Sequence, residues 1–428
     1  MEFRLLRLLV CSLALPLFAF SLFVRAENWP QWRGARLDGV SAEKGIPTTW
    51  SQTENVAWKL ALPGPAGASP VVWKDRIFLT AAEGQDLVLV AISIDGKILW
   101  KRKMGTGNAD VRGDEGNSAS PSPSTDGKYV WAMMATGDLA CYDFAGKEIW
   151  KFDLEDRYGK FDIAFGMTST PVLDGDRLYL QLIHTGSAQV IALDKATGKQ
   201  VWLRERQSDA RAECEHSYAS PVMYQDKERK FLLTHGADYV VAHELKDGKE
   251  LWRCGGLNPP PGGSYRDDFR FVSSPLAVPG LIVVPSCKNG KTLGLSPSGS
   301  GDVTDQSQWQ QWARDDRTPD VPSPLMHDGL VYLCGEDGIL LCLDAKTGEQ
   351  VYLERTHSQR HRASPVYADG KIYLTARDGI VSVVKAGREF ELLASNDIGE
   401  GISASPAISN GRIYLRGFDH LYAIEEAK

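Results

Sequence analysis

The chain has 428 residues and a net charge of −7, and 43% of its residues are hydrophobic and 24% charged. These values are typical of a soluble globular protein rather than a disordered or fibrous one. The acidic balance, without any block of Lys or Arg residues, argues against nucleic acid as a partner. Length alone suggests two or three domains, but an internal repeat indicates a single one.

Residues 1–26 have the pattern of a secretory signal peptide. Arg4 and Arg7 give a positive start, residues 8–24 are apolar, and small residues follow at a candidate cleavage site. A retained membrane anchor is the alternative, because about 17 apolar residues approach the length of a membrane span. No later stretch is apolar enough to cross a bilayer. We therefore expect a periplasmic or secreted protein with no transmembrane segment in the mature chain.

Residues 27–54 are predicted to form an extended leader. They contain Trp29, Trp32 and Trp50 but no alternation of apolar and polar residues that would indicate a strand. We expect these tryptophans to hold the leader against the surface of the folded domain. An aromatic platform for a ligand is the alternative interpretation.

A Ser-Pro or Thr-Pro pair, called the anchor below, recurs eight times. The anchors are Ser69-Pro70, Ser122-Pro123, Thr170-Pro171, Ser220-Pro221, Ser274-Pro275, Ser323-Pro324, Ser364-Pro365 and Ser405-Pro406, and their prolines are 41 to 54 residues apart. Such a period is typical of propeller blades. A glycine followed four residues later by an aromatic residue recurs in the same phase, at Gly96/Trp100, Gly146/Trp150, Gly198/Trp202, Gly248/Trp252 and Gly348/Tyr352.

Each repeat reads as a small antiparallel sheet, most clearly in residues 170–202. Pro171 stands at a strand start, where its missing N–H costs no ladder bond. Asp174-Gly175 and Thr197-Gly198 are turn signals between short apolar, β-prone runs. One such sheet cannot bury its own faces, whereas stacked repeats can.

The two ends of the repeat region complement each other. Residues 55–60, around Trp58, look like the last strand of a repeat that has no beginning, and the repeat that starts at Ser405 lacks a last strand. Joining them removes two unpaired edges. The sequence therefore predicts an all-β fold: one eight-bladed propeller of four-stranded antiparallel blades over residues 55–428, closed by an N-terminal strand that completes the last blade.

Six cysteines follow the candidate signal peptide. Cys141 and Cys342 occupy the position that Ala192 has in the clearest repeat, so we expect both to be reduced, buried packing residues. An even count in an exported chain permits disulfides, and the sequence leaves open the state of Cys214, Cys254, Cys287 and Cys334. There is no CxxC pair, so neither a zinc ribbon nor a thioredoxin-type site is indicated.

The connections between blades are long and charged, and loops on a rigid scaffold often carry binding residues. Residues shortly before the anchors are expected to point toward the axis: His216, Arg270, Asp320, Arg360, His361 and Glu400. A solvated polar rim is the alternative interpretation. No GxSxG, HExxH or P-loop pattern is present, so the sequence nominates neither catalytic residues nor metal ligands.

Residues 192–202, Ala-Leu-Asp-Lys-Ala-Thr-Gly-Lys-Gln-Val-Trp, resemble the tryptophan-docking repeat of the pyrroloquinoline quinone (PQQ)-type propellers. The resemblance implies that the aromatic residue of each repeat stacks on the next blade, which gives a structural role to Trp58, Trp100, Trp150, Trp202, Trp252 and Tyr352. The leader from Asn28 to Gly34 is similar to that of many exported bacterial proteins with PQQ-like repeats.

Two branches of this family imply different functions. Quinoprotein dehydrogenases hold PQQ over Ca²⁺ in the axial funnel beneath a disulfide between adjacent cysteines, and this sequence has no adjacent cysteine pair. BamB-like propellers are non-catalytic scaffolds for protein partners, although Cys11 follows Val10 and not the small residue that lipoprotein processing requires. We expect a monomeric envelope scaffold without a cofactor. A PQQ- and Ca²⁺-dependent dehydrogenase of alcohols or sugars is one alternative, and a propeller that binds glycans or small molecules is another.

Overall fold

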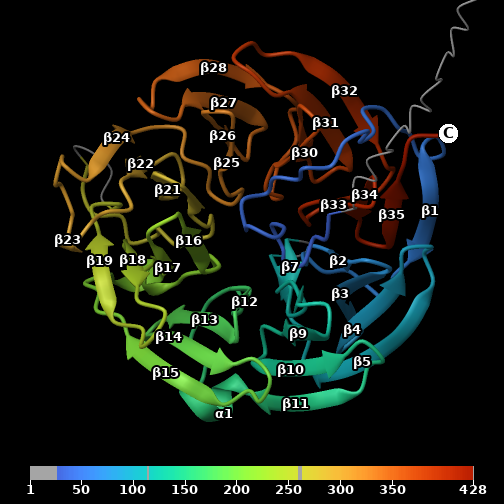
Figure 1. Cartoon of the computed structure of the whole chain (residues 1–428), viewed down its shortest axis with the longest axis horizontal. Coiled ribbons are helices and arrows are strands. Elements are labelled where there is room, and N and C mark those ends of the chain that lie inside the picture. Colours follow the sequence, from blue (N-terminus) through green and yellow to red (C-terminus); the bar gives the residue numbers. More distant parts are fainter. Residues whose placement is uncertain (1–26, 113–114, 259–262, 428) are drawn as a thin grey trace, which may run out of the picture.

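The computed structural model describes residues 27–112, 115–258 and 263–427, and the candidate signal peptide lies outside them. The described strands form eight sheets arranged as blades around one axis (Figure 1). This confirms the predicted eight-bladed propeller. Among the described residues, no helix has the length and apolar character to cross a bilayer.

The strands of each blade follow one another from the axis outward. Blades 1 to 4 are β2 (Val71–Trp73), β3 (Arg76–Glu83), β4 (Asp86–Ser93) and β5 (Ile98–Thr106); β8 (Ser124–Thr125), β9 (Tyr129–Met133), β10 (Asp138–Asp143) and β11 (Glu148–Asp153); β12 (Val172–Asp174), β13 (Arg177–His184), β14 (Ser187–Asp194) and β15 (Gln200–Glu205); β16 (Val222–Gln225), β17 (Lys230–Gly236), β18 (Tyr239–His243) and β19 (Glu250–Cys254).

Blades 5 to 8 repeat this order. They are β20 (Leu276–Val278), β21 (Leu281–Pro285), β22 (Thr292–Leu295) and β24 (Gln310–Arg314); β25 (Leu325–His327), β26 (Leu330–Cys334), β27 (Ile339–Asp344) and β28 (Gln350–Arg355); β29 (Val366–Ala368), β30 (Lys371–Thr375), β31 (Ile380–Lys385) and β32 (Leu392–Asp397); β33 (Ala407–Ser409), β34 (Arg412–Arg416), β35 (His420–Ile424) and β1 (Val56–Ala61).

Three short strands and two helical turns lie outside this pattern. β6 (Asp110–Val111) and β7 (Gly116–Asn117) form a hairpin, and β23 (Gly301–Asp302), in the insertion of blade 5, adds to β19 of blade 4. α1 (Leu154–Tyr158) and a 3₁₀ turn (Ala212–Glu215) belong to connections between blades.

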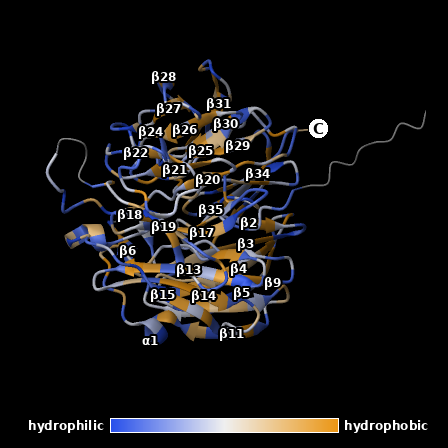
Figure 2. Ribbon diagram, turned by 60° about the vertical axis from the view of Figure 1, so that its left-hand side comes forward, coloured by the Kyte–Doolittle hydropathy of each residue, from blue (hydrophilic) through white to orange (hydrophobic). Residues whose placement is uncertain are grey.

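The burial of the strands explains their composition. The middle strands lie between neighbouring blades, so β13 is buried at all but its first residue, whereas the outer strand β15 is mostly exposed. A strand that is covered on both faces reads as a continuous apolar run. Figure 2 shows these apolar runs inside the ring and hydrophilic residues at the turns.

Four of the six aromatic repeat residues dock on the next blade through an indole hydrogen bond, as the resemblance implies. Trp252 Nε1 and the Tyr352 hydroxyl do not make this bond within the described part of the chain. The indole Nε1 groups of Trp58, Trp100, Trp150, Trp202 and Trp312 donate to turn carbonyls of the following blade at 2.7–3.0 Å. The partner turns contain Gly96, Gly146, Gly198, Gly248 and Gly348, where a Cβ would lie only 2.6–2.8 Å from the indole. The sequence analysis missed Trp312, because an insertion disrupts the glycine spacing of its blade.

Small residues stand opposite the docked aromatic rings. Ala192 lies between Tyr179 and Trp202 in the sheet register, and Cys141 and Cys342 take the same place in blades 2 and 6. Both are free and buried, which confirms the prediction, and the other four described cysteines are also free and buried. Burial raises the pKa of the Cys342 thiol to about 12, so it packs as a neutral group.

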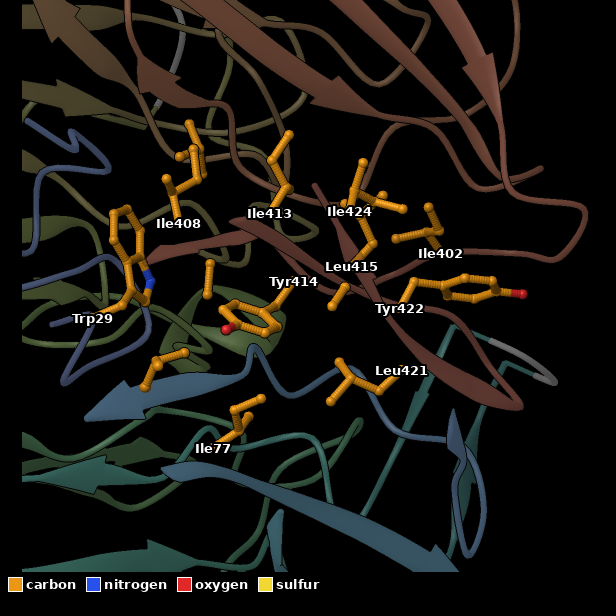
Figure 3. Close-up of a cluster of buried hydrophobic side chains, with 14 of the residues drawn as sticks. Trp29, Ile77, Ile402, Ile408, Ile413, Tyr414, Leu415, Leu421, Tyr422 and Ile424 are labelled. Atoms are coloured by element: carbon orange, nitrogen blue, oxygen red, sulfur yellow. The ribbon is translucent and has the colours of Figure 1, made fainter. Parts of the chain in front are cut away.

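The ring closes through the N-terminal strand. β1 pairs with β35 in antiparallel register, with Trp58 opposite Ala423, which confirms the predicted closure. Figure 3 shows the core behind this seam, where side chains of β34 and β35 meet Ile77 of blade 1 and Trp29 of the leader. Trp29 is fully buried, so the leader contributes to the core.

The leader, residues 27–54, crosses the ring on the face where the inner strands end. Its successive residues serve successive blades: Trp29 forms a bridge with Val72, the Pro30 carbonyl accepts from Thr125, and Gln31 binds Leu173. The chain then crosses the axis to blade 6, where Arg33 donates to Pro324 O at 2.7 Å. Burial lowers the pKa of Arg33 to about 10. We call this side of the ring the leader face and the opposite side the loop face.

Later leader residues cover blades 7 and 8. The Tyr367 N–H donates to the Gly39 carbonyl, and the Ser41 N–H donates to the Tyr367 carbonyl. The Glu43 carboxylate accepts from the Asn410 N–H at 2.8 Å. The leader thus satisfies backbone groups of the inner strand of blade 7 and of the turn after the inner strand of blade 8.

Removal of residues 27–62 tests this closure. The truncated protein loses the fully buried Trp29, worth about 3–5 kcal/mol, and the half-buried Trp58, and it exposes two open edges. We expect a sharply lower melting temperature and aggregation, measured by calorimetry and gel filtration. A truncated protein that melts like the full chain would contradict the closure.

Candidate functional site

The axis of the ring contains a cavity of about 230 Å³ that opens toward the loop face. All eight anchor residues line it, and so do all eight residues two positions before each anchor. In an extended strand, residues i and i+2 point to the same side. The start of every inner strand therefore presents two side chains to the axis.

The anchor hydroxyls form a ring of hydrogen bonds between blades. The backbone N–H of each anchor donates to the hydroxyl of the next one, at 2.9–3.1 Å, from Ser69 to Ser122 and onward to Ser405. At the eighth junction Arg416 of blade 8, which is buried, donates instead to Ala68 O of blade 1 at 3.1 Å. Burial lowers the pKa of Arg416 to about 9.

A second ring of side chains lies above the hydroxyls. These residues, two positions before each anchor, are Gly67, Ser120, Thr168, Tyr218, Val272, Val321, Arg362 and Ser403. They make the wall of the cavity apolar near blades 5 and 6 and polar elsewhere. Trp32 of the leader also lines the cavity, and because the leader lies on the opposite face, we take Trp32 as its floor.

The mouth of the cavity is crossed by ion pairs between distant blades. Glu115, next to β7, pairs with Arg362 of blade 7 at 2.8 Å and is also contacted by Arg360. Arg362 contacts Glu336 of blade 6 as well. β7 lies near the centre of the ring in Figure 1. The ion pairs of Glu115 with the arginines of blade 7 therefore fix the connection between blades 1 and 2 over the axis.

An aromatic and cationic cluster forms the opposite side of the mouth. The guanidinium carbons of Arg112 and Arg270 lie 4.4 Å and 5.3 Å from the centre of the Phe165 ring, within cation–π range. Tyr218 packs 5.8 Å from Phe165, and its buried hydroxyl has no partner among the described residues. Burial raises the pKa of Tyr218, so the hydroxyl stays protonated.

The structure brings together only part of the sequence-predicted set. Arg270 lines the cavity, Asp320 is its ion-pair partner at 3.8 Å, and Arg360 stands exposed at the mouth. Of the six, Arg270 alone is among the described lining residues of the cavity, whereas Asp320 and Arg360 adjoin it through their ion pairs. His216, His361 and Glu400 do neither, which corrects the expectation that they point toward the axis. His216 bonds to Thr185 Oγ1 at 2.9 Å and His361 is buried beside Gln359 O.

Glu400 is the third correction, because it holds blade 8 together. It accepts from the Asp419 N–H at 2.6 Å and from His420 Nδ1 at 2.8 Å. His361 and Asp320 lie three residues before their anchors, so strand alternation turns them away from the axis. This alternation is the signal that would have identified Arg362 and Tyr218.

The connections over blades 3 to 5 have a small core of their own, and we call residues 206–216 and 263–271 the loop crown. Cys214, Phe269 and Cys287 pack together beneath it. The Tyr265 hydroxyl donates to the buried Asp238 carboxylate at 2.5 Å. Exposed charges lie on top, including the Arg211–Asp267 pair at 2.9 Å. The crown is therefore long but preorganised.

The donor set of the cavity does not fit a calcium-bound quinone. Glu115 is the sole carboxylate among its described lining residues, and arginines engage it. Among the described residues no three His, Cys, Asp or Glu side chains are grouped as a metal site. Ca²⁺ takes six to eight oxygen ligands, usually with several carboxylates.

A family model described as Outer membrane protein assembly factor BamB matches residues 41–143, 88–296 and 299–389. The chain belongs to this family. The expected resemblance to PQQ-like propellers is thereby confirmed, whereas no curated protein matches the chain in sequence.

Solved structures of two kinds share the fold. BamB from Moraxella catarrhalis is 14% identical, with 86% of this chain and 98% of that chain covered and a TM-score of 0.63. A europium-containing methanol dehydrogenase is 13% identical, with 92% and 90% covered and a TM-score of 0.68. A quinohemoprotein alcohol dehydrogenase from Comamonas testosteroni is 14% identical, with 94% and 81% covered and a TM-score of 0.65.

Asp238 provides a pH test of the loop crown. Burial raises the pKa of this carboxyl to about 6, above its unfolded value of about 3.9. The folded state then binds this proton more tightly, so the contribution of Asp238 to stability is greatest at low pH and falls as pH rises from about 4 to about 6.

We expect Asp238→Asn to remove about 2–3 kcal/mol of this pH dependence, because the amide oxygen still accepts from Tyr265 but cannot ionise. The measurement is the free energy of unfolding from pH 4 to pH 7 for both proteins. Asp267→Asn, an exposed change on the same crown, is the matched control. Parallel profiles for the wild-type protein and Asp238→Asn would contradict the role of this carboxyl.

Proposed function

We propose that this protein is an exported, non-catalytic scaffold of the cell envelope that binds a protein partner through its loop crown. The observation that carries the proposal is the preorganised crown over blades 3 to 5, fixed from below by its own apolar cluster and by the Tyr265–Asp238 bond. A surface ordered before binding loses less conformational entropy on association.

The charges of the crown support a polar, specific interface. Arg211 and Asp267 have side chains 65% and 64% exposed, and Arg266 and Asp268 form a second ion pair beside them. Exposed ion pairs of this kind contribute little to stability, but charge complementarity with a partner sets specificity and association rate.

The family description adds the envelope context. Because the matching family model is named for outer-membrane protein assembly, a protein of that machinery is the partner class that we propose, with the periplasm as the compartment. The solved BamB structure is only 14% identical to this chain, so its similarity supports the fold alone. The proposed partner class therefore depends on the family match and on the loop crown.

A second candidate function is binding of a small acidic or hydroxylated molecule, including a glycan, in the axial cavity. The anchor hydroxyls favour it, because each keeps its own O–H donor and none of the described anchors spends it on a protein acceptor. Arg112, Arg270 and Arg362 at the mouth add positive charge.

Site-specific photocrosslinking in the native host tests the scaffold function. A photoreactive residue replaces Arg211 or Asp267 on the crown, or Lys97 or Lys199, which are exposed at turns on the leader face, as matched controls. We expect both crown positions to yield an adduct with the same envelope protein, identified by mass spectrometry, and the control positions to yield none. No adduct from the crown, or equal adducts from the controls, would contradict the proposal.

A further inference from the structure

The leader covers the inner strands unevenly. Three residues after each anchor, the inner strand turns its backbone groups toward the axis on the leader face. In blade 1 the Val72 N–H and C=O bond to Trp29 at 2.7 and 2.8 Å, and in blade 7 the Tyr367 groups bond to Gly39 and Ser41, both at 2.9 Å. In blade 3 the side chain of Gln31 makes both bonds to Leu173.

Blades 4 and 5 are the ones that the leader passes by. Met223 in blade 4 and Ala277 in blade 5 are equivalent to Val72 and Leu173. Each of the four is the second residue of its inner strand that pairs with the neighbouring strand of the same blade. Within the described part of the chain, no hydrogen bond from outside its own blade reaches the backbone of Met223 or Ala277. The edges at Met223 and Ala277 are therefore equivalent to those that the leader occupies, and they lie on neighbouring blades that receive no leader hydrogen bond among the described residues. Met326 and Ile408 hold the same position in blades 6 and 8, where the leader bonds to other groups of the blade.

A groove of about 940 Å³ lies at these two edges. Met223 and Ala277 both line it, between leader residues 35–38 on one side and the hairpin turns of blades 4 and 5 on the other. Leu37 and Val278 make its walls apolar. The groove continues the path of the leader around the ring and can therefore hold an extended chain.

The charges around the groove indicate what it binds. Four carboxylates line it, those of Asp38, Asp174, Asp226 and Glu228, against the two cations of Arg36 and Lys227. Arg36 is already paired with Asp38 at 2.9 Å. Asp174 is paired with Lys230, whereas Glu228 is exposed and has no ion-pair partner among the described residues. The groove is thus net acidic with an apolar wall.

We propose that this groove binds an extended segment of a partner protein that carries apolar and basic side chains. Its backbone pairs with Met223 and Ala277 as the leader pairs with Val72 and Tyr367, which is strand addition at a sheet edge. An apolar side chain of the segment packs against Leu37 and Val278, and a Lys or Arg side chain meets Glu228. The site lies on the leader face and is independent of the loop crown.

The experiment uses the protein described here and a displayed library of random 12-residue peptides. Enriched peptides are synthesised with a fluorescent label, and their dissociation constants are measured by anisotropy. We expect peptides with Lys or Arg next to large apolar residues. Glu228→Lys should weaken binding at least tenfold and Lys227→Glu should strengthen it, because both positions are exposed and change only the local charge.

Backbone pairing is tested by the double variant Met223→Pro/Ala277→Pro. Proline removes the outward N–H without removing a ladder bond of the blade, so we expect loss of peptide binding with a melting temperature close to that of the wild-type protein. If this variant unfolds, the two charge variants decide the proposal. Glu389→Lys, exposed on blade 7, is the matched control and should bind peptides unchanged.

Three results would overturn the proposal. They are failure of the library to enrich any peptide, binding that is equal in Glu228→Lys and Glu389→Lys, and binding that persists in a folded Met223→Pro/Ala277→Pro protein. Crosslinking from the loop crown is unaffected by any of these outcomes, so the failure of this site and the failure of the scaffold function are distinguishable.

Discussion

The ring of anchor hydroxyls is the interaction on which the rest of this structure depends. Seven of the eight anchors give their backbone N–H to the hydroxyl of the next blade, and all eight anchor residues are buried. An unsatisfied buried N–H costs about 1–3 kcal/mol, so the requirement for Ser or Thr recurs at seven of the eight junctions between blades. The proline that follows has no N–H and therefore leaves no donor unpaired at the strand start.

This ring determines what the two faces of the molecule can do. The anchors fix where each inner strand begins, so the connections before them rise on one face and the strand ends meet the leader on the other. On the loop face the connections are tied by their own core and by ion pairs across the axis. On the leader face one segment bonds to six blades, and a groove lies at the inner strands of the other two.

Much of the fold could be predicted from the sequence because it depends on local, repeated chemistry. The anchors, the turn glycines and the docking tryptophans are each defined within a few residues, and the orphan strand around Trp58 has one place to pair. Trp312 was missed because a local signal fails where an insertion separates its parts.

The candidate site was predicted less well because its parts come from distant segments. The pairing of Glu115 with Arg362 joins residues 247 positions apart across the axis, and no local pattern encodes it. His361 was predicted to face the axis in place of Arg362, which lines the cavity. The alternation of side chains along the strand, counted back from the anchor, would have identified Arg362 from the sequence. The path of the leader past blades 4 and 5 could be seen only in three dimensions.

The central claim is that this propeller binds partners and does not carry out quinone chemistry, and reconstitution with PQQ tests it most directly. The purified protein is mixed with PQQ and Ca²⁺, offered a panel of primary alcohols and aldoses, and assayed by dye reduction. With Glu115 as the sole described carboxylate of the axial cavity, the account predicts a rate equal to that of the cofactor without protein. Dye reduction above that blank, abolished by Glu115→Gln, would contradict it.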